Sequence, residues 1–345
     1  SWAIIPPSFR FDIRIPADLI EELARLYGYD KIPVQRLSVD ANISQTSQSK
    51  VSSYDISQAL VNRGYQEVIT YSFISNEYHD LIDPSAKKIT LKNPISDDMS
   101  IMRSSLWPGL LQTVEMNQRR GHHNARFFEV GLCFGGISVD DQRQKIAGIV
   151  CGERFESQWG SPEREVDFFD AKSDVESLLS LNGNDYLFEA AEHPALQAGQ
   201  AAKISGNGQL IGWIGALSPY LQKKLSLPKL FLFELNQSDI EQRKVSSYES
   251  FSSFQASQRD IALVVAKDVN IDQLIHAIQS LNQDYLIEVN LFDVYEGEHI
   301  EKGKKSVAFN LTYQSSEGTL TDEQLNQQVE DIITHLESKF SAKLR

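Results

Sequence analysis

The feature that most constrains the fold is a run near the C-terminal end in which two kinds of side chain alternate. Apolar side chains stand at every second position, at Val307, Phe309, Leu311 and Tyr313, and small or polar ones stand between them, at Ser306, Ala308, Asn310 and Thr312. Successive side chains of a strand point to opposite faces, so the run predicts a strand with one apolar and one polar face. Such a strand fits a sheet that helices cover on one side only, which leaves the other side free to meet a ligand.

The segments around this strand predict a complete small domain. The preceding apolar-rich run and the strand are joined by a polar connection with two glycines, which is typical of a β-hairpin with a long loop. Asp260 to Ala266 predicts a further strand, and helices are expected behind a cap at Asn270 and behind the capping box Thr321 to Gln324. With Ser341 to Arg345 as an edge strand, the order is the ferredoxin-like βαββαβ plan. That fold serves several functions, so it does not assign one by itself.

Five short motifs occur in a fixed order in this part of the chain. They are F-x-x-x-x-R-D-I-A-x-V-V from Phe254, L-F-D-V-Y-x-G from Leu291, G-K-K-S from Gly303, T-L-T-D-E from Thr319, and the final Leu344-Arg345. Together they closely resemble the anticodon-binding domain at the end of the bacterial phenylalanyl-tRNA synthetase β subunit. The resemblance implies that residues 246–345 bind the anticodon of tRNA(Phe), with Asp293, Tyr295 and Ser306 as the reading residues.

The chemistry of these three residues suits an unpaired base. The ring of Tyr295 can stack on a base, Asp293 can accept hydrogen bonds from a guanine edge, and the Ser306 hydroxyl can donate or accept. The plainer interpretation is that Tyr295 packs on its neighbours and Asp293 forms a turn. In a regular strand Leu291 would share a face with Asp293, so the functional interpretation also requires a bulge or break near Leu291.

The charge of the chain limits how it could bind RNA. The net charge is −14, and residues 251–345 carry eight Lys and Arg against fifteen Asp and Glu, a net of −7. Phosphate neutralisation therefore cannot dominate, and contact must rest on stacking and hydrogen bonds, helped by a local patch of Lys302, Lys304 and Lys305. The plainer interpretation is that these lysines lie at the tip of a solvated loop. The acidic balance also favours the alternative that this domain is a scaffold or interaction module that does not read RNA.

The middle of the chain, residues 37–245, predicts an α+β domain. Strands outnumber helices and their connections are short, which indicates a mostly antiparallel sheet. The expected strands are Val68 to Ile74, Arg126 to Val130, Lys145 to Cys151, Leu187 to Ala190, Leu210 to Ala216 and Leu230 to Leu235. Two polar, serine-rich stretches, Asp40 to Lys50 and Ser246 to Ser257, are the expected linkers.

Three motifs in this part resemble the class II synthetase-like module of the same β subunit. They are N-P-I-S-x-D-x-S-I-M-R-x-S-L-x-P-G-L-L from Asn93, F-F-E-V-G from Phe127, and F-E-L from Phe233. Class II synthetases hold ATP with an arginine two residues before a glutamate, whereas Arg126 stands three residues before Glu129 and so falls on the opposite strand face. Arg103 is expected in a structural ion pair. We therefore predict a module without catalytic residues that packs against the α subunit; the alternative is an independent class II ligase.

The first 36 residues predict a helix from Asp18 that ends at Gly28, with an apolar side of Leu19, Ile20, Leu23, Ala24, Leu26 and Tyr27. Spacing alone favours a structural role for its acids, since acids suit a first turn and Glu21 can pair with Arg25. The segment resembles the end of the small domain that precedes the synthetase-like core. That resemblance implies a Mg²⁺ site shared with the α subunit, with Asp12, Asp18, Glu21 and Glu22 as its ligands.

Taken together, the resemblance implies a C-terminal piece of a subunit of phenylalanine–tRNA ligase. The whole enzyme joins phenylalanine to its tRNA with ATP, which this chain alone is not expected to bind, in an α2β2 assembly. Two cysteines, Cys133 and Cys151, form no disulfide pattern, and no apolar run is long enough to span a bilayer. A cytoplasmic protein is expected. The chain begins with Ser1 inside a motif, which predicts that it is part of a longer protein.

Overall fold

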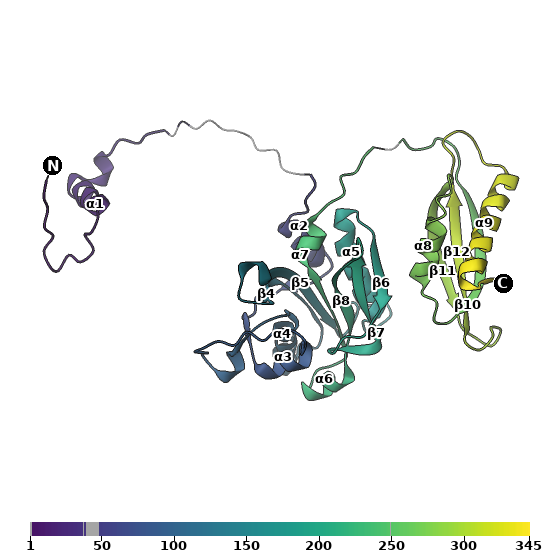
Figure 1. The fold of residues 1–345 in the computed structure, drawn as a ribbon, viewed down its shortest axis with the longest axis horizontal. Coiled ribbons are helices and arrows are strands. Elements are labelled where there is room, and N and C mark those ends of the chain that lie inside the picture. The colour runs from purple at the N-terminus through teal and green to yellow at the C-terminus, as the bar shows by residue number, and fades with distance from the viewer. Residues whose placement is uncertain (1, 37, 39–47, 249) are drawn as a thin grey trace. The chain divides into compact units, whose positions relative to one another are not determined.

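The computed structural model describes residues 2–36, 38, 48–248 and 250–345 (Figure 1). The chain divides into two units, Ser1–Ser47 and Gln48–Arg345. Most of the first predicted linker lies outside the described residues. The described part of the chain has no helix long and apolar enough to cross a membrane.

The first unit contains the helix α1 (Pro16–Tyr27) and the 3-10 turn η1 (Tyr29–Lys31). The predicted end of α1 at Gly28 is confirmed, and the φ of +103° there is a conformation that glycine adopts without strain. The predicted apolar side of the helix is not a buried face: no residue of α1 is buried, and Ile20, Leu23 and Leu26 are 66–75% exposed. The reason is that the described part of this unit supplies no second layer for α1 to pack against.

The second unit begins with a seven-stranded sheet whose strand order is β1-β4-β5-β9-β8-β7-β6. Every neighbouring pair is antiparallel except β1 with β4, which confirms the predicted α+β class. The strands are β1 (Gln66–Glu67), β4 (Ala125–Phe134), β5 (Gln142–Cys151), β6 (Tyr186–Ala190), β7 (Leu196–Gly206), β8 (Gln209–Leu217) and β9 (Leu230–Asn236).

Two predictions for this sheet differ from the structure. The expected strand Val68 to Ile74 is broken: β1 ends at Glu67, and Phe73–Ile74 forms β2, which pairs with β3 (Ile101–Met102). The break occurs because Thr70 turns inward to a buried carboxylate. Strand β7 was not predicted, because its glycines and alanines hide the alternation.

Helices cover both faces of the large sheet. One buried cluster contains residues of α2 (Ser53–Asn62) and α5 (Phe168–Leu179), and the other contains residues of α3 (Asn76–Ile82) and α4 (Trp107–Arg119). Shorter elements complete the module: α6 (Pro219–Lys224), α7 (Gln237–Glu241), and the 3-10 turns η2 (Asp97–Met99), η3 (Val139–Asp141) and η4 (Ser180–Asn182).

A buried ion pair fixes the edge of this sheet. Arg103 donates from Nη1 to Glu129 Oε1 at 2.7 Å and from Nε to the Leu132 carbonyl at 3.0 Å. Both charged side chains are nearly inaccessible, at 5% and 2% exposure, so the predicted structural ion pair is confirmed. The two motif glycines give it room: a Cβ on Gly131 would lie 2.3 Å from Arg103 Nη2, and one on Gly109 would lie 2.1 Å from Thr70 Oγ1.

A second sheet follows in the order β11-β12-β10-β13. Its elements are β10 (Ser257–Ala266), α8 (Ile271–Gln279), β11 (Leu286–Tyr295), β12 (Lys304–Tyr313), α9 (Asp322–Phe340) and β13 (Lys343–Leu344). The predicted caps are confirmed, since Asn270 accepts from the Asp272 amide and Thr321 exchanges hydrogen bonds with Gln324. The observed order is the predicted ferredoxin-like βαββαβ plan.

Candidate nucleic-acid interface

Helices cover one face of the second sheet, and the hydrophobic core of the domain lies between the helices and that face. The buried cluster joins Leu274 and Ile278 of α8 and Leu336 of α9 to Val307 and Phe309 of β12. Residues paired directly across neighbouring strands share a face. The other face of β12 therefore presents Lys304, Ser306, Ala308, Asn310 and Thr312, as the alternation predicts; we call it the open face.

A bulge in β11 determines which of its side chains reach the open face. Leu291 pairs with Phe309 and Asp293 pairs with Ala308, so Phe292 is an extra residue between them. The bulge reverses the alternation at this point: Leu291 faces the helices, and Asp293 lies on the open face. The bulge that the functional interpretation required near Leu291 is present.

The structure brings the three implied reading residues onto this face. Tyr295 pairs directly with Ser306, and Asp293 with Ala308 one row away. Asp293 is exposed and Tyr295 is half-buried, whereas Ser306 is only 3% exposed among its neighbours. A base at this position would meet the ring and the carboxylate before it met the hydroxyl.

Two contacts hold the Tyr295 ring. The Arg345 guanidinium carbon lies 5.5 Å from the ring centroid, within the range of a cation–π contact. A Cβ on Gly297 would lie 2.2 Å from Tyr295 Oη, so the ring rests where only a glycine leaves room. The motifs alone predicted no role for Arg345, although Leu344-Arg345 is one of them. Arg345 joins the site because its amide bonds to the Ala262 carbonyl at 2.9 Å, beside β10.

The two predicted lysines are divided between the faces. Lys304 pairs with Ala266 on the open face, but its Nζ is 2.5 Å from Glu301 Oε2, and this hydrogen bond lowers the pKa of Glu301. Lys305 pairs with Val265, so the register places it on the helix-covered side. The structure thus brings Lys304, but not Lys305, to the implied reading residues.

The four predicted magnesium ligands are not assembled as one set. Arg10 Nη2 lies 2.7 Å from Asp12 Oδ2 and 2.6 Å from Glu22 Oε1, so a guanidinium occupies the place between these two carboxylates. Glu22 also pairs with Arg25, in place of the expected Glu21. Asp18 accepts from the amides of Arg14 and Ile15. Among the described residues, no group of three or more His, Cys, Asp or Glu side chains could hold a metal ion.

These contacts account for the acidity of the carboxylates. The hydrogen bond from Arg10, followed by that from Arg25, lowers the pKa of Glu22 to about 2. The hydrogen bond from Arg10 also lowers the pKa of Asp12, and the amides of Arg14 and Ile15 lower the pKa of Asp18. All three carboxylates are therefore ionised near neutral pH, as ligands of Mg²⁺ would have to be.

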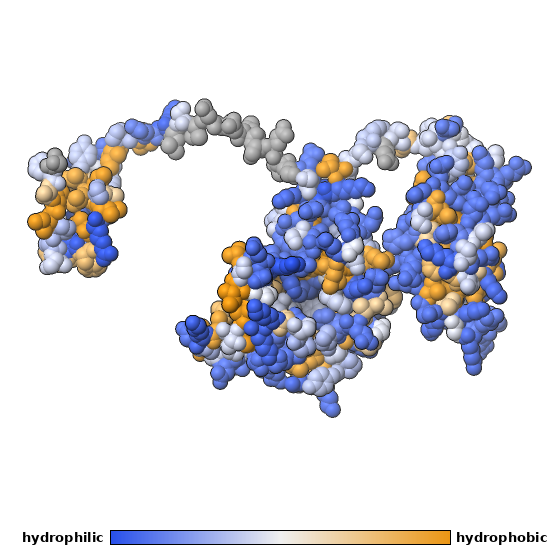
Figure 2. All heavy atoms as spheres, viewed as in Figure 1, coloured by the Kyte–Doolittle hydropathy of each residue, from blue (hydrophilic) through white to orange (hydrophobic). Residues whose placement is uncertain are grey.

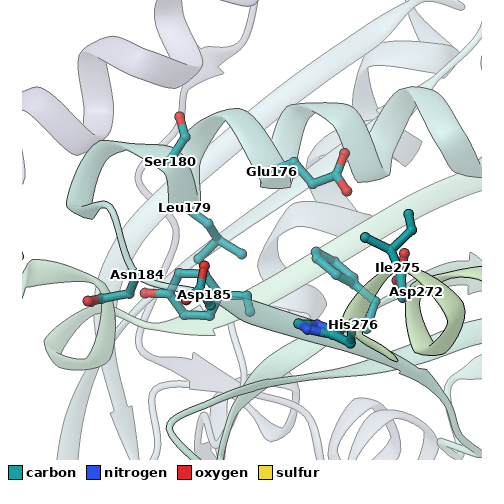
Figure 3. A pocket seen from close by; sticks show the side chains of 10 residues that line it. Glu176, Leu179, Ser180, Asn184, Asp185, Asp272, Ile275 and His276 are labelled. Atoms are coloured by element: carbon teal, nitrogen blue, oxygen red, sulfur yellow. The ribbon is translucent and has the colours of Figure 1, made fainter. Parts of the chain in front are cut away.

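The ATP-binding pair of class II synthetases is not reproduced in the first sheet. Arg126 bonds to Asp174 at 2.9 Å on one side of β4, while Glu129 bonds to Arg103 on the other. Elsewhere in the second unit, residues of α5, β6 and α8 line a pocket of about 250 Å³ (Figure 3). Its lining includes Glu176, Asp185, Asp272 and His276 and none of the predicted site residues.

Comparisons with known proteins identify the family. Residues 32–237 match the family model described as phenylalanyl-tRNA synthetase beta chain CLM domain. The chain belongs to the phenylalanyl-tRNA synthetase β chain family. Residues 252–345 match a ferredoxin-fold anticodon-binding domain, and residues 1–29 match a tRNA synthetase B5 domain. The resemblance seen in the motifs is confirmed.

Curated phenylalanyl-tRNA synthetase β chains align with all of this chain. It is 42% identical to the phenylalanine–tRNA ligase beta subunit of Coxiella burnetii, 43% identical to that of Methylococcus capsulatus and 40% identical to that of Pseudomonas putida. In each case the chain spans 44% of the relative's length. A solved pyrrolysyl-tRNA synthetase of Desulfitobacterium hafniense has a TM-score of 0.41 at 13% identity, over 54% of this chain and 64% of that one.

Replacing Gly297 with alanine tests whether the Tyr295 ring packs against Gly297. We expect Gly297→Ala to destabilise the C-terminal domain by about 0.5–1.5 kcal/mol, because the new methyl group overlaps the end of the half-buried phenol side chain, which must turn from its rotamer and lose the contact with Arg345. Gly318→Ala is the matched control, since no atom lies within 4 Å of a Cβ at that position. Chemical denaturation of the two variants and the parent measures the difference; equal midpoints would contradict the packing described for the ring.

Proposed function

We propose that this chain is the part of a phenylalanine–tRNA ligase β subunit that binds the anticodon of tRNA(Phe) and packs against the catalytic α subunit. In this proposal the whole enzyme attaches phenylalanine to tRNA(Phe) with ATP, and this chain performs no catalytic step. The observation that carries the anticodon assignment is the bulge at Phe292, because it places Asp293 beside Tyr295 and Ser306 on a face that the helices leave free.

The proposed recognition begins with an exchange at the Tyr295 ring. In the free protein the Arg345 guanidinium lies over the Tyr295 ring. An unpaired base would displace it and stack on the ring. The displaced guanidinium is then free to approach a phosphate, as arginine does in many RNA complexes. Asp293 is exposed and offers acceptor oxygens to the N–H groups of a guanine edge. Because Ser306 is buried opposite Tyr295, its hydroxyl would bond to the base only after the Tyr295 ring has moved.

The acidic balance of the domain supports a second candidate, a scaffold that uses the same fold without reading RNA. The two candidates differ in whether the chain distinguishes tRNA(Phe) from a tRNA with another anticodon. Binding measured against both tRNAs separates them, because a scaffold would show no preference for either.

Exposed apolar side chains mark a candidate surface for the α subunit. They lie along the edge of β4 and on the hairpin that joins β4 to β5, and Figure 2 shows hydrophobic side chains gathered on that side of the module. The residues are Ile69, Tyr71, Leu132, Ile137 and Val139, which are 42–92% exposed. A group of exposed apolar side chains on one side of a module is typical of a protein interface. We propose that an α2β2 assembly forms through it.

Magnesium remains part of the proposal for Asp12, Asp18, Glu21 and Glu22. Its support is that Asp12 and Glu22 already converge on one cationic group, Arg10. A Mg²⁺ ion could be held there only after Arg10 turned away, and such a site would retain several waters. We also propose a cytoplasmic location, which is consistent with the two free, buried cysteines.

Removing the Tyr295 ring tests the anticodon assignment. We expect Tyr295→Ala to weaken binding of tRNA(Phe) about 5- to 150-fold, because a base–aromatic stack is worth about 1–3 kcal/mol. Fluorescence anisotropy with labelled tRNA measures the change. Tyr248→Ala, which removes an 84% exposed tyrosine outside the sheet, serves as the control. Equal affinity of Tyr295→Ala and the parent would exclude the assignment and leave the scaffold candidate.

Charged substitutions on the β4–β5 hairpin test the subunit surface. We expect the double variant Ile137→Asp, Val139→Asp to lose the complex with a co-expressed α subunit, because the introduced carboxylates would be buried without partners. Leu210→Asp is the control, since Leu210 is also half exposed and close to a hairpin, that of β7 and β8. Mass measurement of the purified complexes gives the answer; a complete complex from the double variant would place the interface elsewhere.

Calorimetric titration with Mg²⁺ tests the metal assignment. We expect Arg10→Gln to bind Mg²⁺ more tightly than the parent, because the substitution removes the cation that competes for Asp12 and Glu22. Arg14→Gln is the control for loss of a nearby positive charge, since the Arg14 side chain bonds to the Phe11 carbonyl, whereas that of Arg10 bonds to Asp12 and Glu22. If no variant binds Mg²⁺ even with the α subunit present, the four acids are structural.

A further inference from the structure

A cleft of about 810 Å³ lies where β4 begins and β5 ends, at the opposite end of these strands from the hairpin that joins them. Its lining comes from the ends of α2 and α4, from α5 and from the loop that follows β5. The volume is within the range of clefts that bury a small ligand. None of the side chains proposed for tRNA, magnesium or the α subunit lines it.

Two arginines that line the cleft share one buried aspartate of α5. Asp174 accepts from Arg63 Nε at 2.5 Å and from Arg126 Nη1 at 2.9 Å. One carboxylate neutralises one guanidinium, so this group keeps a positive charge. Arg63 also donates to Ser173, and Arg126 to the Arg154 carbonyl. Three of the five N–H donors of each arginine therefore have no partner among the described residues.

A third arginine of the cleft is held in a similar way. The guanidinium of Arg154 lies 4.9 Å from the ring centroid of Phe155, and its Nε lies 3.2 Å from Asp170 Oδ1. Asp170 also accepts two hydrogen bonds from Arg164, so this aspartate too is shared by two guanidinium groups. Guanidinium groups with spare donors are common protein partners of phosphate oxygens. The cleft can therefore bind a phosphate.

The cleft also contains an acceptor that lacks a donor. Glu153 Oε2 is shielded from solvent and accepts no hydrogen bond from any described residue. The glutamate is held in place by its backbone amide, which donates to Asn124 Oδ1 at 3.0 Å. A buried carboxylate oxygen without a donor costs free energy, and a ligand with N–H groups would remove that cost.

The charges of the lining do not suit a simple anion. Three arginines stand against four carboxylates, those of Glu153, Glu156, Asp170 and Asp174, which gives a net charge of −1 with His122 neutral. A suitable ligand carries both a phosphate and N–H donors. Guanine nucleotides have this combination, because the pairing edge of guanine presents two neighbouring N–H donors and a carboxylate accepts from both. Adenine presents a ring acceptor there, which a carboxylate would repel.

We propose that this cleft binds a guanine nucleotide, with the phosphates on Arg63, Arg126 and Arg154 and the base on Glu153. The phosphate contacts give affinity for any nucleotide, and Glu153 gives the preference for guanine. The proposal assigns a small-molecule ligand to the synthetase-like module and does not depend on anticodon binding.

Calorimetric titration of the whole 345-residue chain with GDP, ADP and IDP tests the site. We expect GDP to bind about 5- to 150-fold more tightly than ADP, the range for one bidentate contact to a base. IDP lacks the 2-amino group of guanine and should bind between the two. Glu153→Gln should remove the preference for GDP over ADP, because an amide offers one N–H where guanine requires an acceptor.

Two further variants separate the base contact from the phosphate contacts. Glu156→Gln removes the same charge from the same cleft at an exposed side chain, so it is the matched control and should keep the preference for GDP. Arg154→Gln should weaken GDP and ADP equally, by about 10- to 150-fold, since a hydrogen bond to a charged group is lost. Asp170 stays paired with Arg164 in that variant, and chemical denaturation checks that it is folded.

Three results would overturn the inference. The first is that the parent chain binds no nucleotide, and the second is that it binds GDP and ADP alike; the arginine–aspartate pairs would then serve only to hold the module together. The third is that Glu153→Gln keeps the preference for GDP, or that Glu156→Gln loses it as well, which would exclude Glu153 as the group that recognises the base.

Discussion

The extra residue at Phe292 is the constraint on which the candidate interface depends. Strand β11 has to supply apolar side chains to the helix-covered core up to Leu291 and polar ones to the open face from Asp293 onward. A regular strand cannot reverse its alternation, because successive side chains point to opposite faces. One unpaired residue makes that reversal without interrupting the hydrogen bonding to β12 on either side. Both the core and the polar surface of this small domain follow from it.

The charged side chains in and near the core of the first sheet form ion pairs and hydrogen bonds within the module. Arg103, Glu129, Lys145 and Glu234 are all paired in or near the core, and Glu234 accepts from Ser105 and the Leu106 amide at the start of α4. Removing one partner from such a buried pair typically costs about 3–5 kcal/mol. These side chains therefore hold strands β4, β5 and β9 to the segment that leads into α4.

The parts of this structure that sequence predicted well are those determined by local chemistry. Alternation in β12, the caps at Asn270 and Thr321, and the glycine after α1 depend on residues close together in the chain. The contact of Arg345 with Tyr295 could not be predicted in that way, because it forms only when β13 pairs with β10 across the sheet. The helix-side position of Lys305 was predictable, since it shares parity with Val307. The hydrogen bonds of Arg10 to Asp12 and Glu22 were not predicted, because the sequence argument considered the spacing of the acidic residues and not the arginine among them.

The position of β11 at the edge of its sheet has a consequence for solubility. An outermost strand offers unpaired amides and carbonyls to any other extended chain, which is a common route to aggregation. Here the strand is long and carries exposed apolar side chains at Ile287 and Phe292. Both are the extra residues of bulges, which bend and twist the strand and so deny a second molecule a flat edge to pair with. The irregularity that directs side chains toward a ligand therefore also protects this rim of the domain from unwanted association.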